Sequence, residues 1–240
     1  AVYNKESFIQ STAKALLLGA ETDDDYVIIK HIEMIDNDPD NIKVVDDNGS
    51  EKSFAEQVDE ALGGVLPFYT SLKVCDTPQI LLDVGCEQLP MLYTQKHLKN
   101  AILPPDEKNH RHGLEIEQIK RLPELLSHPV MIIDSPNRKD SIIVVTSEVD
   151  KSDNPIIASI KPNGEGRYEV ENVSSNFITS VYGRNNFSEY FRRIVQSDNL
   201  LFCDKQKSQA MFERWGEQYS ELTNNLDFNI IIHQSRNIVK

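Results

Sequence analysis

The 240-residue chain contains no long apolar run and little cysteine, and each absence excludes a class of protein. No stretch of about 18 apolar residues occurs, so the sequence predicts no membrane-spanning helix. The three cysteines, Cys75, Cys86 and Cys203, form neither an even disulfide set nor a zinc-binding spacing. Reduced thiols in a cytosolic setting are therefore expected.

Basic residues are also scarce, with 25 Lys and Arg against 38 Asp and Glu and a net charge of −13. The excess of acidic over basic side chains is unevenly distributed along the chain. Residues 1–60 hold 15 acidic and 5 basic side chains and so carry a net charge of −10. The remaining residues carry only −3, which neither indicates nor excludes a nucleic-acid partner. We predict an acidic helix-plus-hairpin appendage over residues 1–62 and a separate domain over residues 63–240.

Hydrophobic patterning after residue 63 indicates an α+β fold. Helices are expected after the caps Thr77 and Thr94, and Pro123 should divide another helical segment in two. Short β-branched runs follow residue 130, separated by turn signals that include Asn163-Gly164-Glu165-Gly166. This order predicts N-terminal helices packed on a largely antiparallel sheet of four to six strands. A final strand is expected at residues 229–233.

Several short motifs, in order along the chain, together resemble the C-terminal domain of phage MuF-type proteins. The resemblance covers about residues 65–238. Its motifs include Thr77-Pro78, His97-Leu98, His112-Gly113-Leu114, Leu122-Pro123, Ser135, Ser180-Val181-Tyr182-Gly183-Arg184 and Ile231-Ile232-His233-Gln234-Ser235. Through a more distant likeness to barnase, EndoU, colicin-type nucleases and RelE, it implies a metal-independent ribonuclease toxin of phage or mobile elements.

RNA cleavage without a metal needs a base for the 2′-OH proton, an acid for the leaving 5′-oxygen and donors for the charged phosphorane. Histidine suits both proton transfers because its pKa lies near neutral pH. We predict His112, His233, Ser180 and Arg184 as catalytic residues, with the two histidines exchanging protons. Substrate contacts are predicted from Ser135, Arg138, Lys139 and Tyr182, and no metal or other cofactor is expected.

Each of these residues also has a structural interpretation. His112 before Gly113 can cap a helix, His233 can end a strand, and Tyr182 can pack in the core. A zinc site from His97, His110, His112 and His128 lacks cysteine partners and helical i,i+4 spacing. Neither Cys86 nor Cys203 has a histidine nearby in the sequence, which gives a thiol nucleophile no support.

Two functions therefore remain open. The first is a toxin-like endoribonuclease with RNA as substrate, and the second is a non-enzymatic phage head-associated or interaction module. The expected partners are RNA and a phage head or immunity protein, with no membrane, in the bacterial cytoplasm or the virion. Convergence of His112, Ser135, Ser180 and His233 beside Arg138 or Arg184 in one open cleft would favour the enzyme. Scattering of these residues, or permanent filling of the cleft by carboxylates of the acidic N-terminal part, would favour the interaction module.

Overall fold

A computed structural model of the protein describes residue 44 and residues 50–67, 70–168 and 171–214. The predicted strand at 229–233, with His233, lies outside these residues. Most of the predicted acidic appendage also lies outside them.

The core of the fold is one mixed seven-stranded sheet with the strand order β1-β2-β6-β5-β4-β3-β7. Its strands are β1 (Ser71–Asp76), β2 (Pro90–Thr94), β3 (Met131–Asp134), β4 (Ile142–Val149), β5 (Pro155–Tyr168), β6 (Glu171–Gly183) and β7 (Leu200–Cys203). All neighbouring strands are antiparallel except β2 and β6, which are parallel. The α+β prediction is confirmed, but the strand number exceeds the expected four to six because short strands extend both edges of the sheet.

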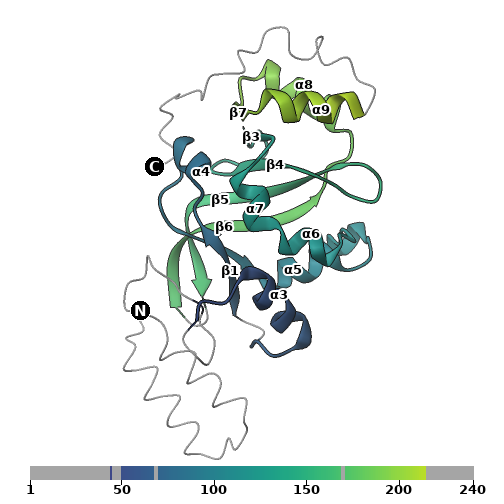
Figure 1. The fold of residues 1–240 in the computed structure, drawn as a ribbon. Coiled ribbons are helices and arrows are strands. Elements are labelled where there is room, and N and C mark those ends of the chain that lie inside the picture. Colours follow the sequence, from purple (N-terminus) through teal and green to yellow (C-terminus); the bar gives the residue numbers. More distant parts are fainter. Residues whose placement is uncertain (1–43, 45–49, 68–69, 169–170, 215–240) are drawn as a thin grey trace, which may run out of the picture.

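The helices lie on both sides of this sheet. They are α3 (Phe54–Gly63), α4 (Gln79–Asp83), α5 (Gln95–Ile102), the 3₁₀ turn η1 (Glu107–Asn109), α6 (Ile116–Lys120), α7 (Leu122–Ser127), α8 (Phe187–Gln196) and α9 (Lys205–Arg214). In Figure 1, α8 and α9 lie together near β7 and β3, away from α3, α5 and α6. The predicted division before Pro123 occurs at Arg121, between α6 and α7.

The apolar run at the start of β4 is explained by these two layers of helices. Ile142 and Val144 belong to the core under α3, α6 and α7, whereas Ile143 and Val145 belong to the core under α8 and α9. Successive side chains of a strand point to opposite faces, so a strand covered on both sides is apolar at every position.

The predicted turn at Asn163-Gly164-Glu165-Gly166 is wrong, because these residues lie within β5. The pairing of β5 with β6 shifts register between Lys161 and Gly164, and Asn163 adopts a φ of 49°. The Asn163 N–H donates to Oδ1 of Asn176 on β6 at 2.8 Å, which stabilises this bulge. The turn-forming residues therefore produce a β-bulge in a long hairpin rather than its end.

Helix α3 is part of the same core as the sheet. Phe54 and Val58 are buried together with Leu72 of β1 and Ile119 of α6. The predicted boundary at residues 62–63 falls at the end of this helix. Within the described parts of the chain, no helix is both long and apolar enough to span a membrane.

Candidate functional site

The C-terminal half of β6 is exposed on one side because its neighbour β2 is short. β2 pairs with β6 only from Met91 to Tyr93, opposite Asn176 to Ile178. After Thr94 the chain turns into α5, whose N-terminus is capped by Thr94 Oγ1 accepting from the His97 N–H at 3.1 Å. Residues 179–183 of β6 therefore continue without β2 beside them.

A cleft of about 1020 Å³ lies against this part of β6. Its lining comes from α5, η1 and the loop after it, the β3–β4 loop, the start of β4, the strand β5, the C-terminal end of β6, and the segment from Arg184 to α8. The lining residues are Lys96, His97, Asn100, Lys108, Asn109, His110, Arg111, His112, Ser135, Asn137, Arg138, Ile143, Ser159, Thr179, Ser180, Val181, Tyr182, Arg184 and Tyr190.

The lining contains five lysines and arginines and three histidines, but no aspartate or glutamate. Elsewhere in the described residues, nine lysines and arginines form ion pairs with carboxylates. None of the five cleft cations has such a partner among the residues that the structure describes. A protein of net charge −13 thus places five cations without an ion-pair partner around one cavity.

His112 is held in the cleft by its own loop. Its N–H donates to the Asn100 carbonyl at 2.9 Å, and the N–H of Gly113 donates to the Leu103 carbonyl at 2.9 Å. Gly113 has a φ of +67°, and a Cβ there would lie 2.7 Å from Cδ of Pro105. Only glycine fits this turn without strain, so the backbone geometry requires a glycine directly after His112.

The imidazole of His112 stacks on the ring of Tyr182, with ring centroids 5.1 Å apart and an interplanar angle of 27°. Burial lowers the pKa of His112 below its ordinary value of 6.5, and the nearby His110 lowers this pKa further. His112 is therefore neutral at pH 7 and able to accept a proton.

Arg184 lies at the α8 end of the cleft. Its N–H donates to the Pro155 carbonyl at 2.9 Å, and its guanidinium carbon lies 4.4 Å from the centroid of the Tyr190 ring. At the preceding Gly183 there is no room for a side chain, because an added Cβ would collide with the side chain of Asp150. The strand that leads into Arg184 therefore packs directly against Asp150.

The β3–β4 loop contributes Ser135 and Arg138, as predicted, and also Asn137. Ser135 Oγ accepts from the Arg138 N–H at 3.3 Å, which shapes the turn. Lys139 is exposed and does not line the cleft.

Ser180 and Tyr182 of β6 line the cleft. Ser180 pairs with Ser159 of β5, which also lines it, and Thr179 Oγ1 donates to the Ser159 carbonyl at 3.2 Å. Six of the eight predicted site residues thus line one cavity: His112, Ser135, Arg138, Ser180, Tyr182 and Arg184.

The remaining lining residues were not predicted as a site. Five of them come from three separate segments, with Lys96 and His97 on α5, Lys108 and Arg111 in and after η1, and Tyr190 on α8, and no short motif joins these segments. For His97 the sequence did contain an indication, because His97-Leu98 is one of the motifs that carry the family resemblance. Its ring lies near Tyr93 and Phe177, and burial lowers its pKa, opposed by a hydrogen bond with the Ile178 backbone.

Metal and thiol chemistry find no support in this part of the chain. Among the described residues, no three His, Cys, Asp or Glu side chains come together in a way that could hold a metal ion. Burial raises the pKa of the Cys75 and Cys86 thiols to about 12 and that of Cys203 to about 11, so these thiols stay protonated at neutral pH.

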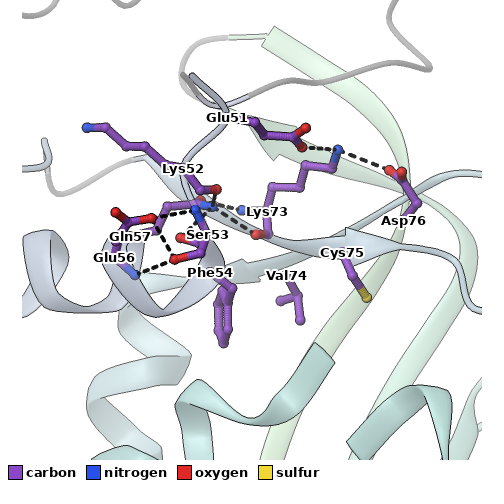
Figure 2. Close-up of a pocket in the computed structure, with 10 residues that line it drawn as sticks. All are labelled: Glu51, Lys52, Ser53, Phe54, Glu56, Gln57, Lys73, Val74, Cys75 and Asp76. Atoms are coloured by element: carbon purple, nitrogen blue, oxygen red, sulfur yellow. Dashed lines mark hydrogen bonds and ion pairs between the residues drawn. The ribbon is translucent and has the colours of Figure 1, made fainter. Parts of the chain in front are cut away.

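A second hollow of about 430 Å³ lies between α3 and β1, and it differs in charge from the cleft. Figure 2 shows one of its two lysines, Lys73, reaching Glu51 at 3.4 Å and Asp76 at 3.0 Å. The other, Lys52, pairs with Glu60 at 2.6 Å. Because carboxylates compensate both ammonium groups, the hollow offers no free cation to an anionic ligand.

The fold and the cleft define an α+β domain with a cationic cavity suited to phosphate-bearing ligands. The family model of the phage MuF C-terminal domain matches residues 105–210, which include most of the cleft. This match confirms, over these residues, the resemblance to the phage MuF C-terminal domain that the sequence motifs predicted. No curated protein and no solved structure matches the chain.

Proposed function

We propose that this domain is a metal-independent endoribonuclease that cleaves RNA by attack of the 2′-OH on the adjacent phosphate. The observation that supports this most is the carboxylate-free cleft, where five cations surround a histidine that is neutral at pH 7. Unpaired Lys and Arg side chains attract a polyanion, and a neutral imidazole can accept the 2′-OH proton.

In this proposal His112 is the base, and Arg184 and Arg138 hold the scissile phosphate. The planar guanidinium suits this role because it binds two phosphate oxygens at once. Ser180 donates a hydrogen bond to the phosphate, while Ser135 and Tyr182 contact the rest of the substrate inside the cleft. Lys139, exposed on the β3–β4 loop, would contact the strand outside the cleft. His233, outside the described residues, is proposed as the acid that protonates the leaving 5′-oxygen.

The setting proposed for this activity is that of a phage effector acting in the host cytoplasm or carried in the virion. An immunity protein or a phage head protein would be its protein partner. The alternative is a phage interaction module that binds without cleaving, and the family match is compatible with it.

The test is cleavage of RNA by the purified protein in the presence of EDTA. We expect cleavage to persist, and His112→Ala and His233→Ala each to lower the rate by roughly 100- to 10,000-fold, as removal of an acid or base commonly does. Lys161→Gln is the matched control, because Lys161 is exposed and outside the cleft.

Full activity of either alanine variant would rule out the assigned histidine, and loss of activity with EDTA alone would rule out the metal-independent mechanism. If the wild-type protein cleaves no RNA, the interaction module is the better account.

A further inference from the structure

The arginine at the α8 end of the cleft is held by an aromatic ring instead of a carboxylate. Arg184 places its guanidinium carbon 4.4 Å from the centroid of the Tyr190 ring. A carboxylate partner would fix the same side chain but neutralise its charge. The ring attracts the cation through its quadrupole and leaves the full positive charge available to a ligand.

Both members of this pair carry a buried polar atom without a hydrogen-bond partner. These atoms are Nε of Arg184 and the hydroxyl oxygen of Tyr190. Tyr190 is only 4% exposed, and it is a lining residue of the cleft. Buried donors are nearly always satisfied in folded proteins, so two unsatisfied donors in one stacked pair indicate an acceptor that binds there.

We propose that Arg184 and Tyr190 form a preset phosphate-binding subsite, in which Tyr190 positions the guanidinium and both side chains donate to one phosphate group of a nucleic-acid strand. This subsite rests on the proposed function only in taking RNA as the ligand of the cleft. It adds Tyr190, which lies in α8 and belongs to no motif of the sequence analysis.

The chemistry of the pair favours phosphate over other ligands. Phosphate is an acceptor-only anion with several oxygens, which matches two donors and one uncompensated charge. The remaining cleft cations, Lys96, Lys108, Arg111 and Arg138, give neighbouring phosphates of the same strand further partners. A single anion at the subsite and a strand along the cleft are therefore both accommodated.

The hydroxyl of Tyr190 stays protonated at the pH values at which RNA binding is measured. Burial raises the pKa of Tyr190 to about 12, although the charge of Arg184 acts in the opposite direction. The hydroxyl thus remains a donor at neutral pH, as the subsite requires.

The experiment measures binding without cleavage, using a 2′-deoxy oligonucleotide, which lacks the attacking hydroxyl, and inorganic phosphate as a second probe. Arg184→Gln should weaken oligonucleotide binding by roughly tenfold or more, because it removes a charge-assisted contact. Tyr190→Phe keeps the ring and removes only the hydroxyl, so it should weaken binding by roughly two- to tenfold. Lys161→Gln, a charge removal outside the cleft, should leave affinity unchanged.

The decisive measurement is the oligonucleotide affinity of the double variant that combines Arg184→Gln with Tyr190→Phe. If the two side chains share one phosphate, Tyr190→Phe should have no further effect once Arg184→Gln is present, because contacting residues are not additive. Inorganic phosphate should compete with the oligonucleotide in the wild type and compete much less in Arg184→Gln. Equal thermal melting of the wild type and Tyr190→Phe would establish that the effect is on binding and not on folding.

Independent effects of the two changes, wild-type affinity in Arg184→Gln, or an equal loss in Lys161→Gln would each overturn the subsite. The ribonuclease proposal fails separately, on intact RNA. An oligonucleotide that binds through Arg184 and Tyr190, with RNA left uncleaved, would keep the subsite and refute the enzyme.

Discussion

His112 is oriented in the cleft by an aromatic ring instead of a carboxylate. Its imidazole stacks on Tyr182, and no carboxylate lines the cleft around it. A carboxylate partner would stabilise the imidazolium and raise the pKa, whereas burial against a neutral ring lowers it. The same arrangement recurs at Arg184 and Tyr190. Two tyrosine rings thus position the two central groups without adding negative charge.

The lowered pKa of His112 predicts a pH dependence with a definite sign. We expect its titration by NMR to have a midpoint below 6.5, and the rate of RNA cleavage to fall as the pH drops through that midpoint. Because the unfolded chain binds this proton more readily, stability should also decrease as the pH falls below about 6.5. Tyr182→Leu should move the midpoint toward 6.5, and Tyr182→Phe should not. A midpoint at or above 6.5 in the wild type would contradict this account of His112.

At the scale of elements, the edge strand β1 is joined to α3 by a glutamine side chain. Gln57 is 2% exposed; its Nε2 donates to the Lys73 carbonyl at 3.1 Å, and its Oε1 accepts from the Lys73 N–H at 2.9 Å. Figure 2 shows this pair beside the capping box of Ser53 and Glu56. The side chain thereby occupies backbone groups that an additional strand would otherwise pair with.

Gln57→Leu should therefore destabilise the fold by about 2–4 kcal/mol, because it leaves two buried backbone groups without partners. Urea unfolding measures this change. Gln79→Ala on α4 removes an exposed glutamine, and we expect it to alter stability by less than about 0.5 kcal/mol. Similar midpoints for the two variants would show that the Gln57 hydrogen bonds contribute little.

At the scale of the whole molecule, the division of the chain near residue 62 remains a prediction, since most of residues 1–60 lies outside the described structure. What the structure adds is that α3 contributes Phe54, Val58 and Ala61 to the main core. The helix therefore belongs physically with the sheet, although it precedes the charge step in the sequence.

A chain beginning at residue 64 should consequently lose cooperative unfolding. Removal of one buried phenylalanine side chain alone costs about 3–5 kcal/mol, which is a large part of the stability of a domain. A chain beginning at residue 44 retains α3, and comparison of the two by thermal melting identifies the segment that the core needs. If the shorter chain melts like the full-length protein, the contribution assigned to α3 is wrong.

Local sequence signals predicted most elements because their causes are local. Thr94 caps α5, Pro123 separates α6 from α7, and the apolar run from Ile142 forms β4. The same signals failed at Asn163, where turn-forming residues form a bulge because Asn176, on another strand, accepts a hydrogen bond from the Asn163 backbone. A partner 13 residues away cannot be inferred from the turn itself.

By itself, the sequence determined the α+β class, the positions of most elements and the family, because capping, alternation and short motifs act within a few residues. It also supplied His112, Ser180 and Arg184 as candidates. Only the tertiary structure decided that these residues share one cleft with Lys96, Lys108, Arg111 and Tyr190. The reason is that β2 pairs in parallel with β6 more than 80 residues later and ends early, so that α5 and its loop face the strand carrying Tyr182. The pKa of His112 and the uncompensated charge of the cleft follow from that long-range pairing.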